Sequence, residues 1–448
     1  MIKKLQFVLM FINTFGQRHK KNLAWGTILG FFITLFILAS YPYFLKLQSQ
    51  KARKIGIVGK YTEKTLPLSI KNQLSFGLTA ITSSGEATPS LSQKWEIDPN
   101  GLTFTFYLYP DLIWHDGTKF KASDVQYNLK DVEITPINDT TLKITLKEPY
   151  APLPVLVSKP LLKENLVGLG IYKAIKLNYF ENWISELALQ SLKSDQPNII
   201  YKFYSNTIDA ILAFKKGEVD ELQNISSPSD LIKWKNVSVK EVTLYDKYVG
   251  VFFNFKNNLF KEKEIRHALA YAIPNFENYE KVYSPISPLS WAYSSKVRLY
   301  EYDPETAKKI LAKSPLSSSS SEITISTYAS LLPTAEKIAE AWKKVGVNAK
   351  TKVENSIPLD YEVLVASQLI PTDPDQYQYW QSTQENTNIT HYNNLKIDKL
   401  LEDGRRTYDK DKRFKIYADF QRYLVDDCPV IFLYYPKVYN LSREKKSL

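Results

Sequence analysis

The side chains that could carry out chemistry are scattered along this chain and match no catalytic motif. Its four histidines are His19, His115, His267 and His391, and no two of them have the spacing of a metal site. The sequence contains no Gly-x-Ser-x-Gly nucleophile elbow, no His-Glu-x-x-His zinc helix and no glycine-rich phosphate loop. We therefore expect no catalytic residue, no bound metal and no cofactor. A hydrolase stays open as an alternative, because catalytic residues can lie far apart in a sequence.

Two single residues have both a functional and a structural interpretation. Cys428 is the only cysteine, so no intramolecular disulfide can form, and its place beside an apolar run favours a small buried side chain. His115 lies in Trp114-His115-Asp116-Gly117, where Asp-Gly is a turn pair whose glycine can take positive φ. There, His115 could contact a ligand or act as a catalytic base. The structural alternative is a turn histidine bonded to nearby backbone.

The positive charge of the chain is concentrated at one end. The formal net charge is +11, and residues 1–54 contain nine Lys and Arg side chains and no acid. The rest of the chain is therefore close to neutral, without the basic stripe that binds phosphate backbones, and we expect no nucleic-acid partner. Positive charge of this kind is typical of a segment beside a membrane, where anionic headgroups attract it.

A 23-residue stretch without charged side chains, 23–45, follows the first basic residues. About 20 such residues cross a bilayer as a helix, and aromatic residues near its ends suit the membrane interface. We predict a retained transmembrane anchor, with 1–22 as a cytoplasmic basic segment and 46–55 as a linker. A cleaved signal peptide is the alternative, but its apolar region would be only about 7–15 residues long.

The elements that would position a site follow two patterns. Residues 56–240 consist mainly of short alternating runs that predict strands, such as 102–108 and 142–146. Residues 241–427 alternate strands with amphipathic helices. Within them, 322–353 predicts a strand, a helix and a second strand, a unit that makes part of a sheet parallel and covers it with helices.

Three groups of segments occur in order between about residues 90 and 435. The first comprises Leu91-Ser92-Gln93-Lys94-Trp95-Glu96, Gly101-Leu102-Thr103-Phe104-Thr105-Phe106 and Trp114-His115-Asp116-Gly117-Thr118-Lys119-Phe120. The second comprises Gly217-Glu218-Val219-Asp220, Val251-Phe252-Phe253-Asn254-Phe255 and Ile265-Arg266-His267-Ala268-Leu269-Ala270. The third comprises Asp373-Pro374-Asp375-Gln376-Tyr377, Tyr392-Asn393-Asn394, Ile397-Asp398-Lys399-Leu400-Leu401 and Pro429-Val430-Ile431-Phe432-Leu433-Tyr434-Tyr435. Together they resemble the peptide-binding (family 5) solute-binding receptors of ABC importers.

This resemblance implies a two-lobed α/β fold of the periplasmic-binding-protein type (class II, family 5) with mixed sheets, preceded by the transmembrane helix. Lobe 1 would comprise 56–240, with the C-terminal strand 428–448 returning to it, and lobe 2 would comprise 241–427. The resemblance further implies a monomeric extracytoplasmic receptor that encloses a peptide or peptide-like ligand between its lobes and delivers it to permease subunits. A membrane-tethered hydrolase and a non-transport interaction protein on the same fold are the alternatives.

The resemblance also supplies candidate ligand-binding residues, because in the family the loop around Asp373-Pro374-Asp375 borders the cleft. The candidates are Trp114, His115, Ile370, Asp373, Asp375, Tyr377, Tyr379 and Trp380. A stretch of the family's lobe is missing after Leu129, which leaves the ligand size open.

Ile370 marks a departure from the family. Peptide receptors of the family typically have an Asp three residues before the Asp-Pro pair of this loop, where it holds the terminal ammonium of the peptide. Ile370 occupies that position here and cannot accept a hydrogen bond. Two explanations remain: Asp373 or Asp375 has taken over through a shift of the loop, or the ligand has no free amino terminus.

Overall fold

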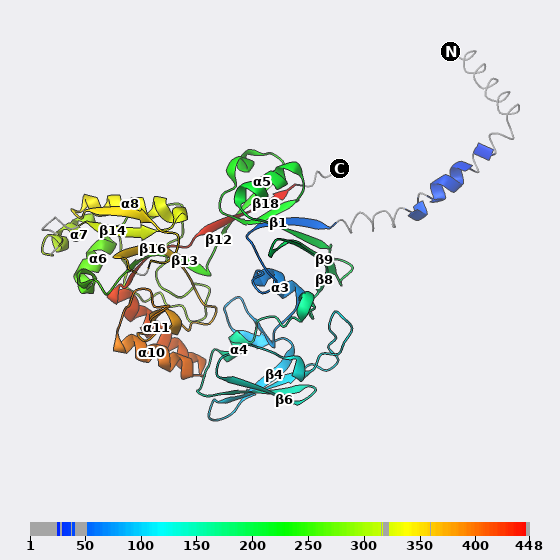
Figure 1. The fold of residues 1–448 in the computed structure, drawn as a ribbon, viewed down its shortest axis with the longest axis horizontal. Coiled ribbons are helices and arrows are strands. Elements are labelled where there is room, and N and C mark those ends of the chain that lie inside the picture. The colour runs from blue at the N-terminus through cyan, green and yellow to red at the C-terminus, as the bar shows by residue number, and fades with distance from the viewer. Residues whose placement is uncertain are drawn as a thin grey trace, which may run out of the picture.

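The computed structural model describes residues 25–26, 29–36, 38–40, 52–314, 316, 322–358 and 360–444 (Figure 1). The first three ranges are helical and belong to the predicted anchor 23–45. The rest of that anchor and the predicted cytoplasmic segment 1–22 lie outside the described residues. Within the part of the chain that is described, no helix combines the length and the apolar character needed to cross a membrane.

The first lobe is built on a seven-stranded sheet in the order β12-β18-β11-β1-β10-β9-β8. Its strands are β1 (Arg53–Val58), β8 (Tyr172–Phe180), β9 (Trp183–Ser191), β10 (Ile199–Tyr204), β11 (Glu221–Ile225), β12 (Val237–Thr243) and β18 (Lys437–Arg443). β1 pairs in parallel with β10 and β11, and the other neighbours are antiparallel, so the sheet is mixed. Two helices pack on this sheet, α3 (Leu68–Leu74) and α5 (Thr207–Lys216). The core includes Ile55, Ile57 and Phe203 against Ile70 and Leu74 of α3.

A four-stranded antiparallel sheet in the order β4-β5-β7-β6 lies beside it. The elements of this region are β2 (Thr79–Ile81), β3 (Ala87–Pro89), β4 (Ser92–Ile97), β5 (Thr103–Leu108), β6 (Val132–Asn138), β7 (Thr141–Leu146) and α4 (Leu153–Leu156). β5 and β7 confirm the strands predicted from alternation, because Phe104, Phe106, Leu142 and Ile144 are fully buried while their neighbours along each strand are more exposed. β2 and β3 form a separate two-stranded hairpin.

The second lobe has a five-stranded sheet in the order β15-β14-β16-β13-β17. Its strands are β13 (Lys247–Phe253), β14 (Ile323–Thr327), β15 (Ala349–Val353), β16 (Val363–Leu369) and β17 (Val430–Tyr434). Its helices are α6 (Lys263–Tyr271), α7 (Pro304–Leu311), α8 (Leu332–Lys344), α9 (Tyr377–Trp380), α10 (Leu395–Arg406) and α11 (Lys410–Asp427). β14, α8 and β15 confirm the predicted strand–helix–strand unit, since β14 and β15 pair in parallel.

Helices cover both faces of this sheet. Val249, Val251 and Phe253 of β13 pack toward α6, α7 and α8, whereas Tyr248 and Phe252 pack toward α10 and α11. In Figure 1, α8 lies above this sheet, and α10 and α11 lie below it. Short 3-10 turns complete the chain: η1 (Ala122–Asp124), η2 (Glu164–Leu166), η3 (Ser229–Lys233), η4 (Asn258–Lys261) and η6 (Ala329–Leu331).

Two adjacent segments connect the sheets. One runs from the end of β12 to the start of β13, and the other from the end of β17 to the start of β18. The backbone N–H of Leu244 donates to the carbonyl of Pro436 at 2.9 Å, so the two crossings are bonded to each other. Such a pair of short crossings is the geometry about which two lobes can rotate.

Candidate functional site

A cavity of about 330 Å³ lies where the two lobes meet near these crossings. Four segments form its walls: the tip of the β2–β3 hairpin, the crossing from β12 to β13, a loop before α7 and the loop after β16. The lining residues are Thr82, Ser83, Ser84, Gly85, Thr243, Leu244, Tyr245, Asp246, Ser287, Leu289, Ser290, Ile370, Pro371 and Thr372. We refer to this space as the cleft cavity.

Backbone contacts hold the hairpin tip against the second lobe. The N–H of Trp291 donates to the carbonyl of Ser84 at 2.9 Å. Gly85 has φ +86°, and a Cβ atom added to it would come within 2.9 Å of the Thr372 carbonyl oxygen. Glycine is therefore required there for both conformation and close approach. Lys410 also pairs with Glu86 next to the tip.

The walls of the cleft cavity combine apolar surface with hydroxyl groups and carry no positive charge. Eight of its fourteen lining residues carry a hydroxyl group, and Asp246 is the only lining residue with a carboxylate. No Lys or Arg is among the lining residues. Hydroxyl groups can both donate and accept hydrogen bonds, so the walls suit an uncharged or amphipathic solute rather than an anion.

Ile370 is the one sequence-predicted candidate that lines the cleft cavity. It follows β16, is only 7% exposed, and packs in the cluster that contains Tyr248 and Trp380. Its backbone N–H donates to the carbonyl of Asp246 at 2.7 Å. The loop after β16 is thereby tied to the crossing between the sheets.

Asp373 and Asp375 both bind arginine side chains. The Arg413 guanidinium donates to the two carboxylate oxygens of Asp373 at 2.8 and 2.6 Å, and both side chains are buried. Asp375 accepts from Arg405 Nε at 2.9 Å and from the backbone N–H of Tyr377 at 3.0 Å. Burial raises the pKa of the Asp375 carboxyl, against the opposing effect of Arg405. Neither carboxylate lines the cleft cavity.

Three of the aromatic candidates, Tyr377, Tyr379 and Trp380, belong to α9. The Arg405 guanidinium lies 4.0 Å from the centre of the Tyr377 ring, a cation–π contact. Tyr379 is half-buried, and Trp380 is 1% exposed, with its indole N–H lacking a hydrogen-bond partner. Tyr377 is brought together with Asp375 through Arg405, whereas Tyr379 and Trp380 pack into the lobe.

Trp114 and His115 lie in the first lobe, apart from this loop. Trp114 is buried against Phe120 in the four-stranded sheet's core, and its indole N–H donates to Asp124 at 3.1 Å. His115 Nε2 bonds the carbonyl of Gly170 at 2.9 Å, and Nδ1 accepts from the N–H of Gly168 at 3.3 Å. Both ring nitrogens are thus bonded to the backbone.

A second cavity, of about 690 Å³, lies between the four-stranded sheet and helices α9 and α10. Its charged and aromatic lining residues are Lys130, Asp131, Lys147, Glu148, Tyr150, Tyr377, Glu402, Arg405 and Arg406. The N–H of Ala151 donates to the carbonyl of Arg405 at 2.7 Å, and Arg406 pairs with Glu148 at 2.9 Å across it. Two ion pairs join its lining residues, Arg406 with Glu148 and Lys147 with Asp131.

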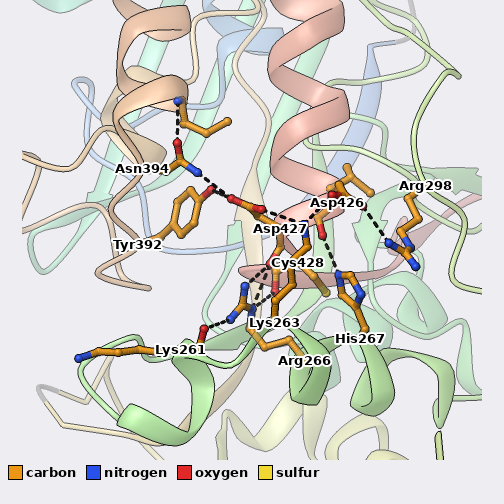
Figure 2. Close-up of polar contacts among 12 residues, drawn as sticks. Lys261, Lys263, Arg266, His267, Arg298, Tyr392, Asn394, Asp426, Asp427 and Cys428 are labelled. Carbon is orange, nitrogen blue, oxygen red and sulfur yellow. Dashed lines mark hydrogen bonds and ion pairs between the residues drawn. The ribbon is translucent and has the colours of Figure 1, made fainter. Parts of the chain in front are cut away.

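A buried polar network around the end of α11 contains the side chains most like catalytic groups (Figure 2). His267 Nε2 donates to the carbonyl of Asp426 at 2.7 Å, and burial lowers the pKa of its imidazole. Burial also raises the pKa of the Cys428 thiol to about 12, which makes it a poor nucleophile at neutral pH. The Arg266 guanidinium donates to backbone carbonyls on α11 and η4. The network joins α6 to α11, and no cluster of metal-binding type occurs among the described residues.

Comparison with known proteins decides the family. A profile of bacterial extracellular solute-binding proteins, family 5 (middle region), matches residues 86–390, more than half of the chain. This chain belongs to that family. It is therefore an extracytoplasmic solute-binding protein, and the space between its lobes is the place to look for the solute.

Several relatives of this solute-binding protein cover most of its length. It is 24% identical to the oligopeptide-binding protein AppA of Bacillus subtilis, over 84% of this chain and 83% of AppA. It is 23% identical to the dipeptide-binding protein of Escherichia coli, over 80% and 83%.

Solved structures share its fold. NikZ from Campylobacter jejuni in complex with Ni(L-His) has a TM-score of 0.71 at 23% identity, covering 88% of this chain and 94% of that one. AppA from Bacillus subtilis in complex with a nonapeptide has a TM-score of 0.69 at 20% identity, covering 89% and 96%.

Sequence reasoning missed most of the cleft cavity of this solute-binding protein. Thr82–Gly85 resembles any polar turn, and Asp246 is an ordinary acid before a strand. The segments are brought together only by the pairing of distant strands, which no local pattern records.

Proposed function

We propose that this protein is the membrane-anchored receptor of an ABC importer, which binds peptides or peptide-like solutes between its lobes and delivers them to a permease. The cleft cavity carries this proposal, because segments of both lobes form its walls. Its volume is at the lower end of the range of about 300–1,000 Å³ for small-ligand pockets. Relatives named as oligopeptide- and dipeptide-binding proteins support the ligand class.

Ligand contact is proposed for Ile370 directly. Asp373, Asp375 and Tyr377 contribute by fixing the loop through Arg405 and Arg413. Contacts of ligand with Tyr379, Trp380, Trp114 and His115 stay predictions. The receptor works without catalysis or a cofactor, as a monomer, with no nucleic-acid partner.

We further propose that the protein is held in the membrane by residues 23–45, with its N-terminus in the cytoplasm. The uncharged run of that segment supports this, as does the exposure of large apolar side chains on its described residues, among them Trp25, Phe32 and Phe36. Membranes washed with alkaline carbonate should retain the full-length chain. A mature chain starting near residue 41 would argue for cleavage instead.

The lobes are proposed to be the two bodies that close on ligand. Lobe 1 carries the seven-stranded sheet, which begins with β1 at Arg53 and includes, from the predicted returning segment 428–448, only β18. Lobe 2 carries the five-stranded sheet, to which β17 of that segment belongs. Dyes on Lys143→Cys and Lys415→Cys, both exposed and on different lobes, would report closure by energy transfer. Cys428 is buried and should stay unlabelled.

The test uses the full-length chain in detergent with a mixture of synthetic peptides of three to five residues. Native mass spectrometry should show one intact peptide per chain, and energy transfer between the dyes should rise. Release of cleaved peptides would favour the hydrolase. Absence of any bound peptide and of any change in energy transfer would favour an interaction protein on the same fold.

A further inference from the structure

Tyr408 belongs to lobe 2 but contacts the core of lobe 1. It is the middle one of the three residues that connect α10 to α11. On one side of it, the Thr407 hydroxyl donates to the carbonyl of Asp403 at 2.7 Å. On the other side, the Asp409 carboxylate accepts from the N–H of Lys412 at 2.8 Å and caps α11. The backbone that carries Tyr408 is therefore held between two helix ends.

Both the ring and the hydroxyl of Tyr408 bind the region of the four-stranded sheet. The half-buried ring packs on the core of that sheet, with its centre 6.0 Å from the centre of the Phe104 ring. The hydroxyl donates to the carbonyl of Gly101 at 2.6 Å and accepts from the N–H of Tyr150 at 3.0 Å. A Cβ atom added to Gly101 would lie 2.5 Å from the ring, so glycine leaves the space that the ring fills. We refer to Tyr408, Gly101 and Tyr150 as the latch.

The latch lies away from the cleft cavity and from the crossings between the sheets. None of its three residues lines that cavity. In Figure 1, α10 and α11 lie at the end of lobe 2 that faces β4 and β6, whereas β12 and its crossing to β13 lie far above these strands. Beside the latch, the N–H of Ala151 donates to the carbonyl of Arg405 at 2.7 Å and also joins the lobes. When two bodies rotate about a hinge, the largest movement occurs far from it, so contacts here resist opening most effectively.

We propose that Tyr408 holds the two lobes closed at the end of the molecule opposite the crossings, and thereby slows the release of a bound solute. All contacts of the latch are made within the chain, so closing through them needs no solute, and the closed state is populated before a solute binds. The effect on release rests on the proposed receptor function, whereas the latch itself can be measured without any peptide. Tyr408 is a positioning residue, which holds the lobes and does not touch the solute.

Arg405 connects the latch to the wall of the cleft cavity. Its Nε donates to Asp375 at 2.9 Å, and its guanidinium lies 5.1 Å from the centre of the Tyr150 ring. Asp375 belongs to the loop after β16, whose first residue, Ile370, lines the cavity. One side of the latch thus shares a loop with the walls of the cavity, and opening the latch should loosen that loop.

The first experiment measures closure of the lobes without peptide. Full-length protein in detergent carries dyes on Lys143→Cys and Lys415→Cys, and single-molecule energy transfer gives the ratio of closed to open molecules. Tyr408→Phe keeps the ring and removes both hydrogen bonds of the hydroxyl, so it should lower this ratio by at least about fivefold. Gly101→Ala should lower it by at least as much, because its Cβ atom displaces the ring. The double variant should open no further than Gly101→Ala, since both changes remove the same contact.

Matched substitutions in the same lobe serve as controls. Tyr109→Phe removes the hydroxyl of an exposed tyrosine that follows β5. Gly117→Ala adds a Cβ atom at a similar positive φ, +87° against +72° at Gly101, but nothing lies within 4 Å of it. Both controls should keep the wild-type ratio of closed to open molecules. A lower melting temperature of Tyr408→Phe without any change in that ratio would show that the tyrosine only stabilises the fold, and would overturn the latch.

The second experiment measures the release of peptide. Protein loaded with synthetic peptides of three to five residues is diluted into an excess of the same peptides labelled with heavy isotopes, and native mass spectrometry follows the exchange. Tyr408→Phe should release peptide at least about threefold faster than wild type, because changes in affinity within one site act mainly on dissociation. Tyr109→Phe should release it at the wild-type rate.

The outcomes separate the latch from the receptor function. An unchanged ratio of closed to open molecules in both Tyr408→Phe and Gly101→Ala, or an equal fall in the two controls, would overturn the latch. A lower ratio with an unchanged rate of peptide release would overturn its effect on the solute. Capture of no peptide by wild type would overturn the receptor function, and the peptide-free measurement would still decide for or against the latch.

Discussion

Arg413, in the first turns of α11, holds both carboxylate oxygens of Asp373, in the loop after β16. The two side chains are 7% and 9% exposed. Burial lowers the pKa of the Arg413 guanidinium, but its interaction with Asp373 outweighs this and raises the pKa above the usual value. The pair fixes the loop that carries Ile370 to a helix of the same lobe.

Replacing Arg413 should therefore destabilise the protein, because the loop after β16 loses the side chain that holds it. Arg413→Met leaves the Asp373 charge buried and unpaired, which should lower the free energy of unfolding by about 3–5 kcal/mol. Urea unfolding followed by circular dichroism measures this. Arg406→Met is the control, because its partner Glu148 is exposed and the pair should contribute under about 1 kcal/mol. A similar small loss in both variants would contradict the prediction.

Cys428 should make stability depend on pH in the alkaline range. Burial raises the pKa of its thiol from 9.0 to about 12. The protonated thiol is thus favoured by folding, so its contribution is complete below pH 9 and is lost as the pH rises toward 12. Between pH 8 and pH 10, wild type should lose about 1.4 kcal/mol more stability than Cys428→Ala. Equal losses of stability in the two proteins would show that folding does not raise the pKa of the Cys428 thiol.

Gly85 and Gly117 form a matched pair for testing the hairpin tip. Both have positive φ, at +86° and +87°, but a Cβ atom at Gly85 meets Thr372 whereas one at Gly117 meets nothing within 4 Å. Alanine at either position should lower the free energy of unfolding by about 1–2 kcal/mol, because positive φ is unfavourable for a residue with a Cβ atom. Gly85→Ala alone should also weaken peptide binding several-fold, because the cavity wall must move. Equal peptide affinities in the two variants would show that the tip is not part of the site.

Lysine should not be able to replace Arg266 without loss of stability. Its guanidinium donates to the carbonyls of Phe260, Lys261, Asp427 and Cys428 (Figure 2). Lysine has no planar fork, so Arg266→Lys leaves buried carbonyls unpaired at about 1–3 kcal/mol each. Thermal unfolding should show a drop of many degrees, whereas the same change at exposed Arg422 should have little effect.

Local patterns predicted the elements of this fold better than its site. The helix of α7 begins after Asp303, whose side chain accepts from the N–H of Thr306 as a cap should, and α8 returns to a parallel strand. These features depend on residues that are close together in the sequence. They could be inferred from periodicity and capping alone.

The site depends on partners that are distant in the sequence. Whether Asp373 was free to bind a ligand could not be known without Arg413, which lies 40 positions later. The position of Asp246 opposite Ile370 requires the register of β13 against β16. A shift of one residue in that register would have turned the acid to the other face.

The position of β18 has a consequence for synthesis of the protein. This last described strand lies inside the first sheet, between β12 and β11. While a ribosome is still making the second lobe, β11 exposes an unpaired edge, and β12 has no partner in the sheet. A chain released early thus carries an open sheet edge that invites aggregation and proteolysis. The sheet of the first lobe can therefore be completed only after the second lobe has been synthesised.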